Sequence, residues 1–284
     1  MDENIIKWLF LTDAFKVSPP DEPFWYTSGK IGPYYINTHY LYGGKEKAEA
    51  LLERIDAIKD DRLNCPSEIA RLTAENFKTD PIYPHVIDMM CKRIRSAVPL
   101  EDIDFISGGE RRDWFFSFMT AKMLNKPHLT IYKDLSAVTE ENGRYSLLGP
   151  GLLKGARVLH IAELVTEASS YKRTWIPAIK MLGADILWTC YIIDRNQGGE
   201  RFFAENNIKA LPLVHIDETF FAAAFEMGLI NKEQLDILTG YYKNPDETMR
   251  QFIKNNPEFI TRALNSDPKT AQRARLCIQN GFYD

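Results

Sequence analysis

Short apolar runs alternate with amphipathic segments in the middle of the chain. Four short apolar runs, each bounded by polar or glycine residues, lie within 102–109, 127–134, 156–163 and 184–194. Such runs are typical of strands that are buried on both faces. The segments RDWFFSFMTAKMLN and SYKRTWIPAIKMLG lie between them and have helical spacing. This alternation predicts an α/β fold in which helices flank a parallel sheet.

The flanking segments have different patterns. Apolar residues recur at helical spacing from Asn4 to Phe15, and the aromatic segment FWYTSGKIGPYYINTHYLYGG then suggests a hairpin or two short strands. Residues 44–98 read as helices without a strand, and the pattern is helical only from about Asp217 onward. We therefore expect one α/β domain over 1–220, with a helical insertion at about 44–98, and a C-terminal helical appendage over 221–284.

Composition limits the classes of function. The 284 residues are 45% hydrophobic and 26% charged, with a formal net charge of −4. This balance gives no general attraction to nucleic acid or to an anionic membrane, so an anionic ligand would need local positive charge. The opening residues contain no basic leader and no apolar run reaches membrane-spanning length, so we expect a cytoplasmic protein. The four cysteines and five histidines are scattered, which disfavours a disulfide framework or a metal site.

Ligands of parallel sheets bind beyond the carboxyl ends of the strands, and three of these ends carry polar clusters. In ISGGERRDW, Gly108 and Gly109 would permit close backbone approach, while Arg111 and Arg112 bring two permanent charges to the start of a helix. This combination suits a pyrophosphate. A turn with solvated arginines is an equally good interpretation.

The second and third clusters are also ambiguous. Thr166, Ser169 and Ser170 lie where a strand passes into a helix and could surround a phosphate, although such residues are also ordinary helix caps. Glu163 stands just before this turn, where it could accept hydrogen bonds from sugar hydroxyls. Arg195 follows the next strand and could bind a carboxylate, or it could form a structural turn with Asp194.

Together these motifs resemble the orotate phosphoribosyltransferases, a family of type I phosphoribosyltransferases. The resemblance covers roughly residues 5–220. The segments that carry it occur in the family's order and are FWYTSGKIGPYYIN, ISGGERRDWFFSFMTAKMLNKP, GARVLHIAELVTEASS and IIDRNQGGERFFAENNIKALPL. The resemblance implies a parallel sheet with a small N-terminal hood. It also implies a Mg²⁺-dependent reaction in which orotate displaces pyrophosphate from phosphoribosyl diphosphate, and a homodimer.

The family pattern assigns roles by position. Tyr34 and Tyr35 would flank the base, with Ser28 and Lys30 beside it, and Arg195 would hold the orotate carboxylate. Gly108 and Gly109 would belong to the pyrophosphate loop, with Arg111 and Arg112 beside it. Thr166, Ala168, Ser169 and Ser170 would cradle the 5′-phosphate, with Ala168 in place of the usual glycine, and Glu163 would hold the ribose diol. Lys133 and Arg144 would be the catalytic cations of the loop, and we add Arg111 and Arg112 as further catalytic cations that could compensate from the other side of the site.

Several positions depart from the family. Ala162 replaces the first of two adjacent acids, and Ala168 would cost about 1 kcal/mol if its φ is positive. Glu167 would repel a phosphate unless it points outward. In the catalytic loop, DLSAVTEENGRYSLLG after Lys133, only Lys133 and Arg144 remain as cations. Fewer cations should slow the departure of pyrophosphate.

Two functions remain open from the sequence. One is an enzyme that joins orotate, or a similar carboxylated base, to phosphoribosyl diphosphate. The other is a non-catalytic protein of the same fold that senses a nucleotide or phosphoribosyl diphosphate, because the weakened positions are mainly those of catalysis and diol binding.

Overall fold

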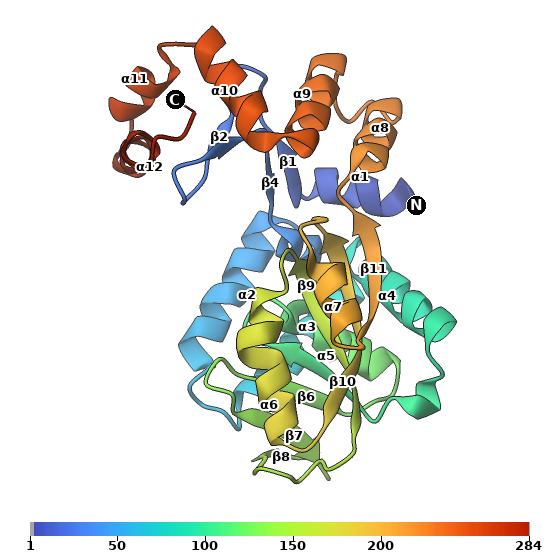
Figure 1. Ribbon diagram of the computed structural model, residues 1–284. Helices are drawn as coiled ribbons and strands as arrows, with labels where there is room; N and C mark the ends of the chain where they lie inside the picture. Colours follow the sequence, from blue (N-terminus) through green and yellow to red (C-terminus); the bar gives the residue numbers. More distant parts are fainter. Residues whose placement is uncertain (1–2, 284) are drawn as a thin grey trace. The chain divides into compact units, whose positions relative to one another are not determined.

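The computed structural model describes residues 3–283, which form two compact units (Figure 1). One unit contains the chain up to Ala14 and Thr38–Ile216, and the other contains Phe15–Asn37 and the chain from Asp217 onward. The sequence places the hood segment in one domain with the sheet, up to residue 220. In the structure this segment groups with the C-terminal helices.

A seven-stranded sheet with the order β11-β10-β9-β5-β6-β7-β8 forms the centre of the first unit. The five strands from β11 to β6 are parallel, and β7 and β8 continue the sheet as an antiparallel hairpin. The strands are β5 (Phe105–Gly109), β6 (His128–Ile131), β7 (Ala137–Glu141), β8 (Arg144–Leu147), β9 (Arg157–Val165), β10 (Asp185–Asp194) and β11 (Lys209–His215).

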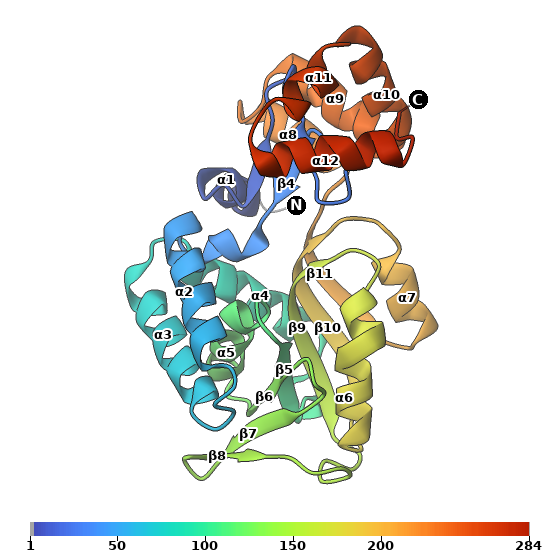
Figure 2. The ribbon, with the colours of Figure 1, turned by 90° about the vertical axis from the view of Figure 1, so that its left-hand side faces the viewer.

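Helices cover both faces of this sheet, which confirms the predicted fold class (Figure 2). One side carries α2 (Lys45–Ile58), α3 (Cys65–Thr79), α4 (Tyr83–Ala97) and α5 (Trp114–Met123), and the other carries η3 (Tyr171–Trp175), α6 (Ile176–Met181) and α7 (Gly199–Glu205). The remaining elements of this unit are α1 (Glu3–Leu11), η1 (Thr38–Tyr42) and η2 (Leu100–Asp102). Residues 44–98 contain three helices and no strand, as expected.

Burial explains why α5 lies at the centre of its layer. Its residues Trp114 to Ala121 are all buried, so the helix is apolar on every side, and it contacts β5, β6 and β9 as well as α3 and α4. On the opposite face of the sheet, Trp175, Ala178 and Ile179 of η3 and α6 pack into the core with Val158 and Tyr191 of the strands. The sheet is therefore buried on both faces, as the apolar runs predict.

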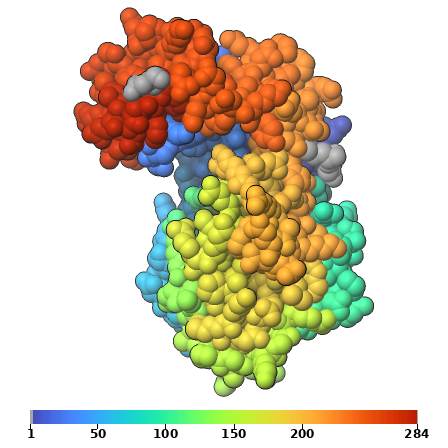
Figure 3. Space-filling model, viewed as in Figure 1, coloured from blue at the N-terminus to red at the C-terminus, as the bar shows by residue number. Residues whose placement is uncertain are grey.

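The second unit joins short strands to helices. Phe24–Trp25 (β2) pairs with Ile31–Gly32 (β3), and Phe15–Val17 (β1) pairs with Tyr34–Ile36 (β4). Trp25 stacks on Phe259 with ring centroids 5.4 Å apart. Figure 3 shows the red C-terminal helices directly beside the blue segment that contains these strands. The helices are α8 (Glu218–Glu226), α9 (Lys232–Lys243), α10 (Pro245–Asn255), α11 (Phe259–Leu264) and α12 (Pro268–Gln279).

Two features of the sheet were not predicted from the sequence. Residues 134–149, interpreted as a catalytic loop, contain the β7–β8 hairpin, whose two-residue turn is Asn142–Gly143 with φ values of 52° and 79°. Asn-Gly strongly favours such a turn. The other feature is β11, whose Pro212 is tolerated because β11 is an edge strand.

None of the described helices is long and apolar enough to cross a bilayer.

Candidate functional site

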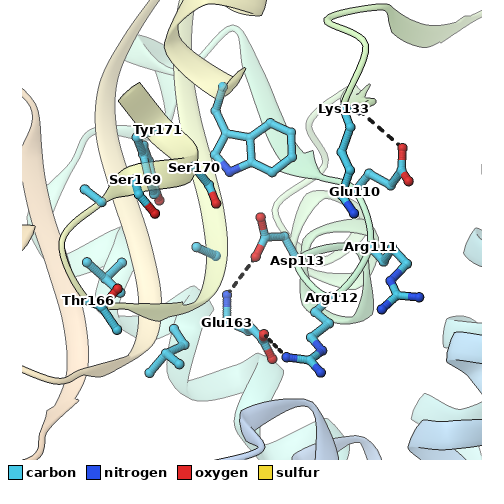
Figure 4. Close-up of a pocket in the computed structure, with 15 residues that line it drawn as sticks. Glu110, Arg111, Arg112, Asp113, Lys133, Glu163, Thr166, Ser169, Ser170 and Tyr171 are labelled. Carbon is cyan, nitrogen blue, oxygen red and sulfur yellow. Dashed lines mark hydrogen bonds and ion pairs between the residues drawn. The ribbon is translucent and has the colours of Figure 1, made fainter. Parts of the chain in front are cut away.

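A hollow of about 340 Å³ lies at the carboxyl ends of β5, β6 and β9 (Figure 4). This is the edge at which parallel α/β sheets bind their ligands. The lining side chains come from the β5–α5 turn, from Lys133 after β6, and from the end of β9 with the turn and helix that follow it: Glu110, Arg111, Arg112, Asp113, Lys133, Ala162, Glu163, Leu164, Val165, Thr166, Ala168, Ser169, Ser170, Tyr171 and Trp175. The structure thus brings together eight of the sixteen residues predicted for the site.

The turn after β9 has the polar lining expected of a phosphate cradle. Thr166, Ser169 and Ser170 all face the hollow, whereas Glu167 is exposed and does not line it. Ala168 has a φ of 55°, which is the left-handed conformation that favours glycine. The acidic side chain in this turn is therefore no obstacle to an anion.

The two arginines after β5 have different surroundings. Arg111 forms an ion pair with Asp56 of α2, and its side chain points away from the centre of the hollow in Figure 4. Arg112 is half exposed, and its Nη1 lies 3.5 Å from Oε1 of Glu163. Arg112 is therefore the arginine that is better placed to meet a ligand.

Glu163 is held between two basic side chains. Its Oε1 faces Arg112, and its Oε2 lies 3.5 Å from Nδ1 of His39, which is buried. Neither Oε2 of Glu163 nor Nδ1 of His39 has a hydrogen-bond partner among residues 3–283. A buried carboxylate oxygen in this state is suited to accept a hydrogen bond from a ligand hydroxyl.

A buried polar network supports Glu163 from behind. Asp113 accepts a hydrogen bond from the Glu163 backbone N–H at 3.1 Å, and its other oxygen lies 3.6 Å from Nε2 of His160. Nδ1 of His160 is 2.8 Å from the Ser107 hydroxyl. Burial raises the pKa of Asp113 above its usual value. This network fixes the backbone at the end of β9.

The two predicted cations of the catalytic loop, Lys133 and Arg144, do not lie together. Lys133 lines the hollow, and its backbone N–H donates a hydrogen bond to Glu110 at 3.2 Å. Arg144 is an exposed residue of the hairpin strand β8 and does not line the hollow. It was placed in the site because the family has a mobile loop where this chain has the hairpin.

Gly108 and Gly109 have a packing role that the sequence did not indicate. Neither lines the hollow, and both are buried in β5. A Cβ atom on Gly108 would collide with Ser117 of α5, and one on Gly109 would collide with Trp175. Glycine is required here by the close approach of these side chains.

The residues predicted for the base lie elsewhere in the chain. Ser28, Lys30, Tyr34 and Tyr35 belong to the second unit. There Tyr34 is 7% exposed and its ring stacks on Phe15, while Lys30 forms a 2.7 Å ion pair with Asp246. Their predicted contacts with a base, and that of Arg195, remain predictions. Arg195 follows β10, and its backbone N–H donates to the carbonyl of Val165 at 3.0 Å.

One further group could reach a cation. Ligand atoms of Asp194, Glu200 and His215 lie within 4.8 Å of one another. Asp194 already accepts hydrogen bonds from the Tyr191 hydroxyl at 2.7 Å and from the Asn196 backbone at 2.6 Å. Its oxygens are thus committed to fixing the turn after β10.

Comparison with known proteins identifies the fold. The structure superposes on the UMP synthase of Leishmania donovani with a TM-score of 0.55 at 16% identity, covering 85% of this chain and 41% of that chain. For the orotate phosphoribosyltransferase of Francisella tularensis the TM-score is 0.51 at 16% identity, covering 84% and 93%. The chain has the type I phosphoribosyltransferase fold.

Sequence comparison agrees with this phosphoribosyltransferase fold. The chain is 28% identical to an orotate phosphoribosyltransferase of Bartonella henselae over 121 residues, which are 41% of this chain and 58% of that protein. It is 27% identical to one from Methanosphaera stadtmanae over 174 residues, which are 61% of this chain and 95% of that protein. No model of a known protein family matches the chain. The resemblance to orotate phosphoribosyltransferases read from the motifs is confirmed.

Sequence reasoning missed several residues of this phosphoribosyltransferase-like site. Glu110, Asp113, Tyr171 and Trp175 line the hollow, and His39 supports it from behind. Glu110 and Asp113 flank the two arginines in ERRD, so the charge pattern itself was a usable signal. The position of His39 beside Glu163 depends on tertiary structure and gave no local signal.

Proposed function

We propose that the chain is a phosphoribosyltransferase that joins orotate, or a similar carboxylated base, to phosphoribosyl diphosphate in pyrimidine nucleotide biosynthesis. The products would be orotidine 5′-phosphate and pyrophosphate. The observation that carries this proposal is the strand-end hollow, in which the Thr166–Ser170 turn and Arg112 face a shared space. The names of the relatives support the same activity.

The charges around the hollow favour an anion. Arg111, Arg112 and Lys133 line it together with three acidic residues, Glu110, Asp113 and Glu163. Burial favours the neutral form of Asp113, and Glu110 lies 3.8 Å from Lys59 and 3.9 Å from Arg62. Arg111 is paired with Asp56, so Lys133 and Arg112 are the lining cations that can meet a ligand, and Arg112 can leave Glu163 to bind a diphosphate.

The residues suggest a division of roles. The turn after β9 would bind the 5′-phosphate through its hydroxyls and backbone N–H groups. Glu163 would bind the ribose diol through Oε2, which lies beside His39 but accepts no hydrogen bond from residues 3–283, while Arg112 and Lys133 would stabilise the negative charge on the leaving pyrophosphate. Mg²⁺ would bind with the diphosphate and offset its charge, and Glu163 is the lining carboxylate with an oxygen available to its hydration shell.

A second function is favoured by one observation. Arg144 does not line the hollow, so Lys133 is the only one of the two predicted loop cations at the site. A protein that binds phosphoribosyl diphosphate without turning it over would tolerate this loss. Binding and turnover must therefore be measured separately.

The test uses the purified full chain with orotate, phosphoribosyl diphosphate and Mg²⁺. Loss of orotate absorbance reports turnover, and calorimetry with phosphoribosyl diphosphate and Mg²⁺ reports binding. We expect both, and we expect Arg112→Gln to weaken diphosphate binding by roughly ten- to a hundredfold, because a charged hydrogen bond contributes about 1.5–3 kcal/mol.

Lys180→Gln is the matched control, because Lys180 is an exposed cation of α6 that does not line the hollow. Binding without turnover would favour the sensor over the enzyme for orotate. Absence of binding, or equal weakening by both variants, would refute the proposed site.

A further inference from the structure

A second hollow, of about 450 Å³, lies entirely within the second unit. The N-terminal segment supplies one wall of it, and α11, α12 and the turn between them supply the other. Its lining residues are Pro19, Glu22, Pro23, Phe24, Trp25, Tyr35, Phe259, Arg262, Ala263, Ser266, Thr270 and Arg273. Its volume is in the range of small-molecule sites, and it shares no lining residue with the strand-end hollow.

The apolar part of this hollow is aromatic. Trp25 and Phe259 stack with an interplanar angle of 8°, and the rings of Phe24 and Tyr35 lie 4.8 Å apart. Trp25 and Phe259 are buried, whereas Phe24 and Tyr35 are half-buried and offer accessible ring surface. Stacking on such rings recognises any flat ligand ring.

The polar part of the hollow is held in place. The backbone carbonyl of Trp25 accepts hydrogen bonds from the Tyr35 hydroxyl at 2.6 Å and from Nη1 of Arg273 at 2.8 Å. Arg273 is therefore positioned beside the aromatic wall while most of its N–H donors are left for a ligand. Thr270 and Ser266 add hydroxyl groups to the same wall.

The charge of this hollow is positive. Arg262 and Arg273 line it against one acid, the exposed Glu22. No ion pair joins Arg262 or Arg273 to a carboxylate among residues 3–283, although the charge of Arg273 helps to lower the pKa of Asp267. Arginines that lie near aromatic rings and form no ion pair are well suited to bind a planar carboxylate or a phosphate.

We propose that this hollow is a second ligand site, which binds a planar aromatic anion by stacking on Phe24 and Tyr35 and by ion pairing with Arg262 and Arg273. The anionic group is a carboxylate on the ring or a phosphate attached to it. The site does not depend on turnover at the strand-end hollow. It gives the C-terminal helices a binding role in addition to packing.

The test measures binding of two probes to the full chain by calorimetry, with phosphoribosyl diphosphate and Mg²⁺ left out. Orotate presents a ring carboxylate, and uridine 5′-monophosphate presents a ring with a phosphate. We expect at least one probe to bind, and Arg262→Gln to weaken it about tenfold or more. Arg262 is exposed, so its substitution should leave the fold intact. The probe that binds more tightly identifies the anionic group.

Two controls locate the binding. Arg275→Gln removes an exposed arginine of α12 that does not line the hollow, and it should leave the affinity unchanged. Arg112→Gln alters the strand-end hollow and reports any binding of the probes there. The proposal is overturned if neither probe binds, if Arg112→Gln but not Arg262→Gln abolishes binding, or if inorganic phosphate binds as tightly as the nucleotide. None of these results bears on turnover, so the proposed function is tested separately.

Discussion

Ala168 occupies a backbone position that would suit glycine better. Its φ of 55° places a Cβ atom in the left-handed region, which costs about 1–2 kcal/mol relative to glycine. Part of this cost is offset because the methyl group is 4% exposed and therefore buried. The turn after β9 thus keeps its shape at some expense of stability.

We predict that Ala168→Gly raises the free energy of unfolding by about 0.5–1 kcal/mol, because the strain is removed and only one methyl group is lost. Urea unfolding measures this change. Ala178→Gly is the control, since Ala178 is a buried helical residue of α6 and its replacement should lower the same quantity by about 1 kcal/mol or more. A loss of stability in both variants would contradict the assigned strain.

Single residues also mark the limit of the sequence reasoning. The sequence predicted that Glu167 points outward if the turn binds a phosphate, because an inward carboxylate would repel the phosphate. The packing role of Gly109 could not be foreseen, because Trp175 is 66 positions away in the sequence and meets it only in the folded protein. Local chemistry could be predicted from the sequence, whereas contacts between residues far apart in the sequence could not.

At the scale of elements, His128 links β6 to α5. Its Nε2 lies 2.8 Å from the Ser117 hydroxyl, its Nδ1 lies 3.0 Å from that of Thr130, and its ring stacks on Phe118. Burial lowers the pKa of His128 to about 3, with the charge of His160 as a smaller cause. The neutral imidazole is therefore the form that joins strand and helix.

This lowered pKa predicts a pH dependence. In the unfolded chain His128 takes up a proton at its ordinary pKa of about 6.5, whereas in the folded chain it does so only near its lowered pKa. The contribution of His128 to the free energy of unfolding is therefore complete above pH 6.5 and declines as the pH falls toward 3. The stability difference between wild type and His128→Gln should shrink by about 1.4 kcal/mol per pH unit below pH 6. Urea unfolding from pH 7 to pH 4.5 tests this, and a constant difference would contradict it.

Elements with strong local signals were predicted best. The apolar runs of β5, β6, β9 and β10 identify buried strands without any tertiary information. The β7–β8 hairpin was missed although Asn142–Gly143 is a strong local turn signal, because the family resemblance led to a loop in its place.

At the scale of the whole molecule, the chain passes from the first unit to the second at Phe15, returns to the first at Thr38 and enters the second again at Asp217. The N-terminal segment depends on packing partners that follow it by about two hundred residues. Phe15 contacts Phe220, Tyr34 contacts Tyr241, and Trp25 contacts Phe259. The sequence predicted the helices of the C-terminal segment, but it did not predict that they pack on residues 15–37.

We predict that Phe259→Ala destabilises the second unit by about 3–5 kcal/mol, because it removes a buried ring that stacks on Trp25. Amide hydrogen exchange measured by mass spectrometry should then accelerate in residues 24–36 and in α12. Phe225→Ala is the control, since Phe225 is 38% exposed on α8 and should change exchange little. Acceleration in α12 without acceleration in 24–36 would show that the two segments do not stabilise each other.

The open margins of the sheet have a consequence for solubility. An unpaired strand margin can recruit a strand from another molecule, and proteins block this with proline or with charged side chains. Pro212 lies in β11 at one margin, and Arg144 stands exposed in β8 at the other, opposite Glu141. Arg144, which the sequence suggested as a catalytic group, is thereby placed where it discourages aggregation.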